Sequence, residues 1–267
     1  MRSGLCLLCG AEDQEVVFSY ARRPEGETDF GIPPEHYRRE FRRCRRCGHM
    51  SAFTGPQLTS LYARAYVDAT YADGELDASF ERIMSLPPER SDNAQRVRRI
   101  QEWMVDRGRE HTLLDVGSGL GVFPAAMAEA GWRCTALDPD PRAADHAERR
   151  IGVNTICTDF MVAENLGQFS LITLNKVLEH VEDPVQMLAR TRRFLGPSGT
   201  VYVEVPDGEL AAEDPEGENR EEFFIEHLHA FSASSLSLLV DRTGYTSRRI
   251  ERIRDPSGKY TLAAFLE

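Results

Sequence analysis

The sequence predicts an α/β fold built on a parallel sheet, with a small metal-binding unit in front of it. An apolar run over 113–116 is followed by a glycine-rich turn and by an apolar stretch that can form a helix. A second apolar run ends in Asp138, roughly 20 residues beyond the first glycine of the turn. Two Cys-x-x-Cys pairs lie nearer the start of the chain, and that spacing indicates a metal site.

Length, charge and hydropathy limit the classes of protein to consider. With 267 residues, the chain can hold one sizeable domain and a second, small one. Its formal charge of −11 argues against a general nucleic-acid binder, because such a domain is expected to be basic. No apolar run approaches the roughly 20 residues that span a membrane, and the N-terminus is too short and cysteine-marked for a signal peptide. We therefore expect a cytoplasmic protein that makes no membrane contact.

Residues 1–55 form the first predicted unit, which is zinc-ribbon-like. Each Cys-x-x-Cys pair places two thiolates on a tight turn, and the glycine that follows permits the backbone geometry. Four thiolates suit a closed, tetrahedral, structural Zn²⁺ site. The expected ligands are Cys6, Cys9, Cys44 and Cys47. The insert 11–41 would form a hairpin. Two alternatives stay open: His49 in place of one cysteine, and a redox role for one pair.

The segment 38–46 of this unit is locally very basic. One interpretation is a contact to phosphate or nucleic acid. The other is a solvated face, because arginine stands for lysine almost everywhere in this chain and an arginine cluster is therefore weak evidence. Lys176 and Lys259 are the only lysines. We favour the solvated face, or a small phosphorylated ligand, over nucleic acid.

A helical connector is expected over 56–93, with Tyr62, Tyr66 and Tyr71 in an aromatic run. These tyrosines either line a substrate pocket or pack the connector on the following domain. That domain is predicted over 94–267. It opens with an amphipathic helix over 94–107, because apolar residues recur there at helical spacing.

The glycine-rich turn carries the strongest functional signal. It reads Asp-x-Gly-x-Gly-x-Gly, formed by Asp115, Gly117, Gly119 and Gly121, and glycine allows the backbone to approach a ligand closely. Such turns serve NAD, FAD or S-adenosylmethionine. The last of these has an ammonium and a carboxylate instead of a pyrophosphate, so an acidic residue at the mouth of the turn suits it.

The remaining elements alternate as an α/β fold requires. Strands are expected over 132–137, 155–157, 169–174 and 200–205, helices over 123–130, 139–150, 184–195 and 232–243, and a closing hairpin over 248–254 and 259–266. The acidic stretch 208–220 is poor in apolar residues and is expected to be a mobile insertion.

From about Gln95 onward, these motifs resemble the class I S-adenosylmethionine-dependent methyltransferases. The resemblance implies a Rossmann-like sheet of seven strands with an antiparallel last strand. It implies that Asp138 bonds the ribose hydroxyls and Asp159 the adenine amino group, next to Phe160. The segment that begins with Asn175 resembles the family's fourth motif, which meets the reacting methyl group. His180 in this segment is a candidate general base, or a structural hydrogen-bonding residue.

A second chemical cluster lies over 222–232, where Glu226 and His227 stand side by side between aromatic residues. A Glu–His pair suits removal of a proton from a hydroxyl, an amine or a carbon next to a carbonyl. Here the chain is similar to zinc-ribbon deoxysugar C-methyltransferases. In that group, His, Glu and Tyr side chains deprotonate a carbon of a nucleotide-linked sugar. This chain stops before the additional C-terminal domain of that group.

We therefore expect methyl transfer from S-adenosylmethionine to a small molecule, a nucleotide-linked sugar or a specialised metabolite. Oxygen, nitrogen and carbon acceptors stay open, as does the oligomeric state. The main alternative is an RNA or DNA methyltransferase that binds nucleic acid through the ribbon and the arginine cluster. Two other hypotheses are a non-catalytic binder and a dinucleotide oxidoreductase. The intact glycine motif disfavours the first, and the absence of a Gly-x-Gly-x-x-Gly pattern disfavours the second.

Overall fold

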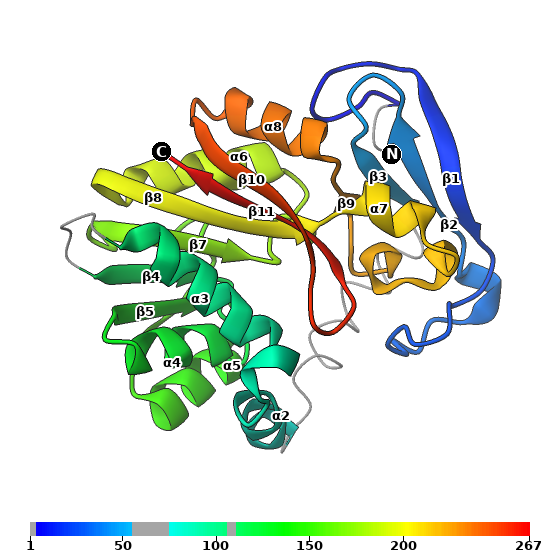
Figure 1. The fold of residues 1–267 in the computed structure, drawn as a ribbon. Coiled ribbons are helices and arrows are strands. Elements are labelled where there is room, and N and C mark those ends of the chain that lie inside the picture. The colour runs from blue at the N-terminus through cyan, green and yellow to red at the C-terminus, as the bar shows by residue number, and fades with distance from the viewer. Residues whose placement is uncertain (1–3, 55–74, 106–110) are drawn as a thin grey trace.

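The computed structural model of the protein describes residues 4–54, 75–105 and 111–267. Figure 1 shows a large twisted sheet with helices on both faces, beside a smaller sheet built largely from N-terminal residues. Among the described helices, none has the length and apolar character needed to cross a membrane.

The large sheet has seven strands in the order β10-β11-β8-β7-β4-β5-β6. Their bounds are β4 (Thr112–Val116), β5 (Arg133–Asp138), β6 (Asn154–Cys157), β7 (Phe169–Asn175), β8 (Leu195–Pro206), β10 (Ser247–Arg254) and β11 (Tyr260–Leu266). Strands β4 to β8 run parallel, whereas β11 pairs antiparallel with both β8 and β10. The predicted seven-stranded α/β sheet with its closing hairpin is confirmed.

Two helical layers cover this sheet because its strands are apolar on both faces. On one face, Leu113 packs with residues of α3 (Asp92–Met104) and α4 (Val122–Glu129). On the other face, Leu114 belongs to a cluster with residues of α6 (Pro184–Arg190) and α8 (Ala233–Arg242). The remaining helices are α2 (Glu75–Met84), α5 (Pro141–His146) and α7 (Gly208–Glu213), and short helical turns span Pro34–His36, Pro88–Arg90, Ala147–Ile151, Thr191–Arg193, Gly217–Asn219 and Glu221–Phe223.

The small sheet is antiparallel and has the order β1-β2-β3-β9. Its strands are β1 (Gln14–Tyr20), β2 (Arg39–Cys44), β3 (Met50–Thr54) and β9 (His229–Ala230). The pairing of β1 with β2 is the hairpin expected from the insert between the cysteine pairs. The fourth strand comes from the segment that carries Glu226 and His227. The N-terminal unit is therefore completed by a part of the chain that lies in the second predicted domain.

Two expectations about the chain are wrong. The acidic stretch 208–220 is not a mobile insertion: it forms α7 and a helical turn, and Ala211 is fully buried. The Asp207 side chain caps α7 at the Leu210 N–H, and the Tyr20 hydroxyl bonds the Glu218 carbonyl, so polar contacts order this stretch despite its few apolar residues.

The second error concerns the end of the helix expected over 184–195. Helix α6 ends at Arg190, and β8 begins at Leu195 instead of Thr200. The glycines and proline expected to form a turn lie inside β8, because a register shift in its pairing with β7 accommodates them. The connector residues Tyr62, Tyr66 and Tyr71 lie outside the described residues.

Candidate active site

The glycine-rich turn joins β4 to α4 with its three glycines at positive φ. Gly117, Gly119 and Gly121 have φ values of 70°, 52° and 72°, a region that L-residues other than glycine rarely adopt. A Cβ on Gly117 would also lie 2.9 Å from Cγ2 of Val177. This position therefore requires glycine on two grounds.

A cavity of about 500 Å³ opens beside this turn, at the carboxyl ends of the parallel strands where ligands of such sheets bind. Its walls include Val116, Gly117, Leu137, Asp138, Asp159, Phe160, Val177, His180, Val181 and Met187. Four of the expected cofactor-binding residues, Gly117, Asp138, Asp159 and Phe160, are thus brought together.

Asp138 links this cavity to the turn. Its carboxylate accepts hydrogen bonds from the N–H groups of Gly119 and Asp140, both at 2.9 Å. Burial raises the pKa of Asp138. A carboxylate held in this way at the end of β5 can still accept hydrogen bonds from the hydroxyl groups of a ribose. The apolar walls suit the rest of a nucleoside, so the residues fit S-adenosylmethionine.

Asp115, Gly119, Gly121 and Asn175 lie behind the cavity and not among the residues that line it. The Asp115 carboxylate accepts hydrogen bonds from Thr173 Oγ1 at 2.6 Å and from Asn175 Nδ2 at 3.0 Å. Burial raises the pKa of Asp115 to about 7. In the described chain this carboxylate ties β4 to β7 beneath the turn.

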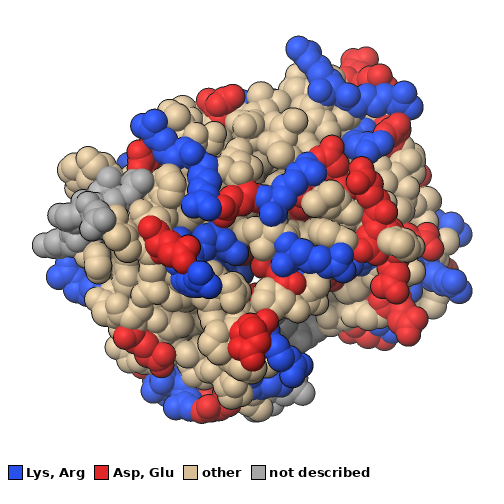
Figure 2. Space-filling view, viewed as in Figure 1, with Lys and Arg blue, Asp and Glu red and all other residues tan. Residues whose placement is uncertain are grey.

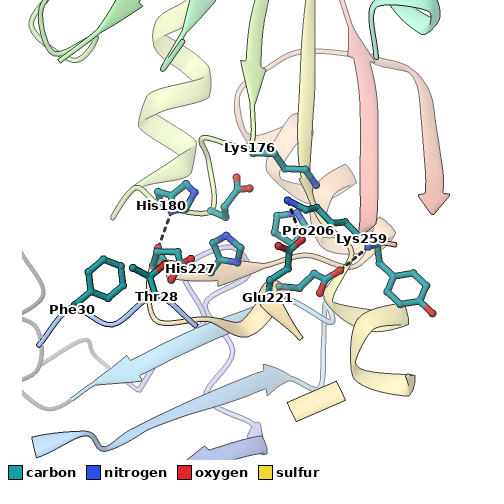
Figure 3. Close-up of a pocket in the computed structure, with 12 residues that line it drawn as sticks. Thr28, Phe30, Lys176, His180, Pro206, Glu221, His227 and Lys259 are labelled. Carbon is teal, nitrogen blue, oxygen red and sulfur yellow. Dashed lines mark hydrogen bonds and ion pairs between the residues drawn. The ribbon is translucent and has the colours of Figure 1, made fainter. Parts of the chain in front are cut away.

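A second cavity of about 450 Å³ adjoins the first, and the two share Lys176 and His180. Figure 3 shows its lining, which comes from five parts of the chain: the N-terminal loop, the segment after β7, the end of β8, the segment 221–227 and the residues at the start of β11. Because it meets the first cavity at the expected position of the methyl group, it is the natural place for an acceptor. We call it the acceptor cavity.

His180 and His227 both line the acceptor cavity, and their ring centroids lie 4.9 Å apart. The Nδ1 of His180 donates to the Glu226 carbonyl at 2.9 Å. The buried Nδ1 of His227 has no hydrogen-bond partner among the described residues. Burial lowers the pKa of His227 well below its usual value, so its ring is neutral near pH 7.

Two carboxyl groups stand beside these imidazoles. Burial raises the pKa of Glu226, whose Oε2 has no hydrogen-bond partner in the described chain. Glu179 is fully buried, and burial raises its pKa as well. The structure therefore brings the three predicted catalytic residues together and adds Glu179, which the sequence motif placed near the chemistry without assigning it a role.

Both lysines of the chain also line the acceptor cavity. The Lys176 Nζ bonds Thr261 Oγ1 at 2.5 Å, and Lys259 pairs with Glu221 at 3.1 Å. Lys176 has a φ of 58°, a strained value for a residue with a side chain. Sequence reasoning missed these residues. Their rarity in an arginine-rich chain was a signal that could have found them.

The N-terminal sheet holds the segment that carries Glu226 and His227. The Ala52 N–H donates to the Leu228 carbonyl at 2.9 Å, and the Leu228 N–H donates to the Glu179 carbonyl at 2.7 Å. Ser232 Oγ bonds the Cys47 carbonyl at 3.1 Å. The segment is therefore fixed between the cysteine turns on one side and the strand end that carries Glu179 on the other.

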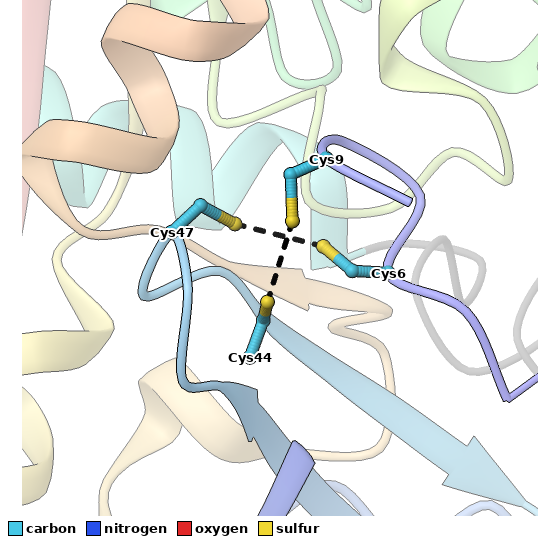
Figure 4. A group of neighbouring side chains, drawn as sticks. All are labelled: Cys6, Cys9, Cys44 and Cys47. Atoms are coloured by element: carbon cyan, nitrogen blue, oxygen red, sulfur yellow. Dashed lines mark hydrogen bonds between the residues drawn. The ribbon is translucent and has the colours of Figure 1, made fainter. Parts of the chain in front are cut away.

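Four cysteine side chains converge next to this sheet, as Figure 4 shows. The Cys6 and Cys47 sulfurs are 3.6 Å apart, and the Cys9 and Cys44 sulfurs are 3.5 Å apart. A tetrahedral Zn²⁺ with Zn–S bonds of about 2.3 Å requires sulfur separations of roughly 3.8 Å. The donor set and its spacing thus fit zinc.

The two turns match in detail. The Gly10 N–H donates to the Cys6 carbonyl and the Gly48 N–H to the Cys44 carbonyl, both at 2.9 Å, and both glycines have positive φ. His49 is not part of this group: its Nε2 lies 3.1 Å from Nδ1 of His229.

Acidic partners pair with four of the six arginines in the basic segment 38–46. Arg39 forms a fully buried pair with Glu27, whereas Arg43 and Arg45 pair with Glu15. Figure 2 shows acidic and basic side chains interspersed over one face of the molecule. These pairs reduce the positive charge that the segment offers to the phosphates of a nucleic acid.

Comparison with known proteins agrees with this geometry. A family model described as "Methyltransferase domain" matches residues 80–249. Among curated proteins, the ubiquinone biosynthesis O-methyltransferase of Caulobacter vibrioides is 34% identical over 99 residues, 34% of this chain and 39% of the relative. The corresponding enzyme of Pseudomonas paraeruginosa is 33% identical over 131 residues, which are 46% of this chain and 56% of the relative. The matches thus span about two fifths to just over half of these relatives.

Solved structures share the fold. A 1,6-didemethyltoxoflavin-N1-methyltransferase from Burkholderia thailandensis, with bound S-adenosylhomocysteine, is 20% identical with a TM-score of 0.57, over 84% of this chain and 96% of that one. The magnesium protoporphyrin IX methyltransferase of Synechocystis, also with S-adenosylhomocysteine, is 14% identical with a TM-score of 0.57, over 76% and 98%.

Proposed function

We propose that this chain, which belongs to the methyltransferase-domain family, transfers a methyl group from S-adenosylmethionine to a small molecule bound in the acceptor cavity. The observation that carries this proposal is the junction of the two cavities at Lys176 and His180. An acceptor that fits the second cavity, of about 450 Å³, would face the methyl group of a cofactor in the first.

The acceptor atom we propose is a hydroxyl oxygen. The printed names of the curated relatives are those of O-methyltransferases, and the acceptor cavity is lined by groups that can take a proton. A nucleotide-linked sugar and a hydroxylated specialised metabolite both offer such an oxygen. The likeness to deoxysugar C-methyltransferases rests on the sequence motifs alone, and a carbon acceptor is the outcome that would support it.

In the cofactor cavity, Asp138 and Asp159 are proposed to hold the ribose and the adenine, with Phe160 beside the ring. The glycines Gly117, Gly119 and Gly121 shape the turn, and Asp115 with Asn175 supports it from behind. S-adenosylmethionine supplies a methyl group on a positively charged sulfur. The chain's own work is to align the acceptor with it and to exclude water.

The Glu226–His227–His180 cluster is proposed to remove the acceptor's proton. The hydroxyl proton moves to this cluster, the oxygen lone pair forms the new bond to the methyl carbon, and the electrons of the broken carbon–sulfur bond stay on sulfur. A neutral His227 and a buried Glu226 are both able to accept a proton near the reacting oxygen. We further propose that Cys6, Cys9, Cys44 and Cys47 hold a structural Zn²⁺ that fixes the segment bearing this cluster.

The test is His227→Ala, assayed with S-adenosylmethionine carrying a labelled methyl group and a small-molecule extract. Label transfer is expected to fall at least about 100-fold, because a general base typically contributes roughly 10²- to 10⁴-fold to the rate. The affinity for S-adenosylhomocysteine should change little, because His227 does not line the cofactor cavity. Equal losses in both would contradict the assignment of this cluster as the base.

A further inference from the structure

Glu179 is a buried acid in the wall of the acceptor cavity. Its side chain is 0% exposed, and neither carboxylate oxygen has a hydrogen-bond partner among the described residues. Burying a carboxylate without a hydrogen-bond or ion-pair partner costs on the order of several kcal/mol, so such a group is usually paired or bound to a metal. Glu179 lines the acceptor cavity, where a bound group can reach it.

Two imidazoles complete a cluster around this acid. One ligand atom each of Glu179, His180 and His227 lies within 4.8 Å of the other two. Figure 3 shows His180 and His227 projecting into the same cavity from two different segments of the chain. One of these segments follows β7, and the other is tied to the N-terminal sheet through β9.

The outer hydrogen bond of the His180 imidazole is that of a metal ligand. A metal-binding histidine almost always donates its second ring N–H to a carbonyl or carboxylate, which fixes the tautomer. His180 donates from Nδ1 to the Glu226 carbonyl, so Nε2 is the nitrogen that would bind a cation. The Nδ1 of His227 is buried and has no hydrogen-bond partner among the described residues, so this nitrogen can bind a cation.

From these contacts we propose that Glu179, His180 and His227 bind one divalent transition-metal cation, such as Zn²⁺, in the wall of the acceptor cavity. Two imidazoles and one carboxylate are a donor set that first-row divalent cations favour, and three protein ligands leave coordination positions open toward the cavity. This site is separate from the four-cysteine site and has different donors.

The role of this cation deepens the proposed function and rests on it. An acceptor hydroxyl bound to the cation has a lowered pKa, as metal-bound water has. The proton passes to the Glu226 carboxylate, the oxygen lone pair attacks the methyl carbon, and the carbon–sulfur electrons stay on sulfur. In this arrangement His180 and His227 hold the cation, and of the proposed cluster only Glu226 takes the proton. The loss of methyl transfer expected for His227→Ala would then come from loss of the cation.

The experiment measures zinc in the full-length protein after dialysis against a small excess of Zn²⁺. Elemental analysis should give two ions per chain for the unaltered protein and one for Glu179→Gln, a substitution that keeps the shape of the side chain. His227→Ala should also hold one. The matched control is Glu221→Gln, which alters an acid in the same cavity outside the cluster and should retain two ions.

Chelator competition provides the affinity. The second ion should bind at least about 100-fold more weakly to Glu179→Gln, because even the loss of an outer hydrogen-bond partner costs 10- to 100-fold. Unaltered affinity for S-adenosylhomocysteine shows that each variant is folded. One ion per chain in the unaltered protein, or two in Glu179→Gln, overturns the proposal. Zinc binding is read without methyl transfer, so failure of the proposed function would leave this result intact.

Discussion

Phe223 is predicted to be the residue that fastens the catalytic segment to the N-terminal sheet. Its ring is 0% exposed and packs edge-on against two others, with centroids 4.9 Å from Phe18 and 5.1 Å from Phe41. Replacing a fully buried Phe by Ala costs about 3–5 kcal/mol of unfolding free energy. Two aromatic pairs, each contributing about 0.5–1.5 kcal/mol beyond buried area, place Phe223→Ala in the upper part of that range.

The assay is urea unfolding followed by tryptophan fluorescence, with the exposed Val162→Ala as the matched control. With an m-value of about 1–3 kcal/mol/M, the midpoint for Phe223→Ala should fall by at least about 1 M. The control should shift by less than about 0.5 kcal/mol. A loss below about 1 kcal/mol for Phe223→Ala would show that this aromatic cluster does not fasten the segment to the N-terminal sheet, and the reasoning would fail.

Three further predictions concern the cofactor, the zinc site and a buried ion pair. Gly117→Ala should weaken S-adenosylhomocysteine binding at least tenfold by calorimetry, since its Cβ would meet Val177 at positive φ, whereas Gly4→Ala, in open space, should not. Cys44→Ser should lose one zinc ion per chain and unfold more readily; a metal-free, fully folded native protein would refute the zinc ribbon. Burial alone would raise the pKa of Glu204, but the positive charge of Arg96, with which it pairs, outweighs this effect and lowers the pKa to about 2. The folded protein gains roughly 3 kcal/mol from this shift. That stability is present above pH 4.5 and is lost as the pH falls toward 2. Urea titrations across this window should show the loss in the native protein but not in Glu204→Gln.

Local patterns made the central sheet predictable. Leu113 and Leu114 face opposite helical layers, and such doubly buried strands appear in sequence as continuous apolar runs. The cysteine turns could also be predicted from local sequence, because Gly10 and Gly48 adopt the positive φ that their positions indicated. In these elements local preference and tertiary structure agree.

The rest depended on contacts between distant parts of the chain. The acidic stretch 208–220 is ordered by bonds such as that of Tyr20 to Glu218, which no local pattern encodes. Strand β9 has two residues and pairs with β3, so its sequence alone is too short to indicate a strand. The proximity of Glu179 to His227 also depends on distant contacts, because the Leu228 and His229 N–H groups donate to the Glu179 carbonyl. Its motif therefore indicated proximity to the chemistry but no role.

The most direct test of the account incubates the purified protein with S-adenosylmethionine labelled in its methyl group and two separate pools of acceptors. One pool is a small-molecule extract that includes nucleotide sugars, and the other is total RNA and DNA. The two adjoining cavities and the acidic partners of the arginines in segment 38–46 predict label in the small-molecule pool. Label confined to the nucleic acids would contradict the proposed substrate class and assign the N-terminal unit to nucleic-acid binding.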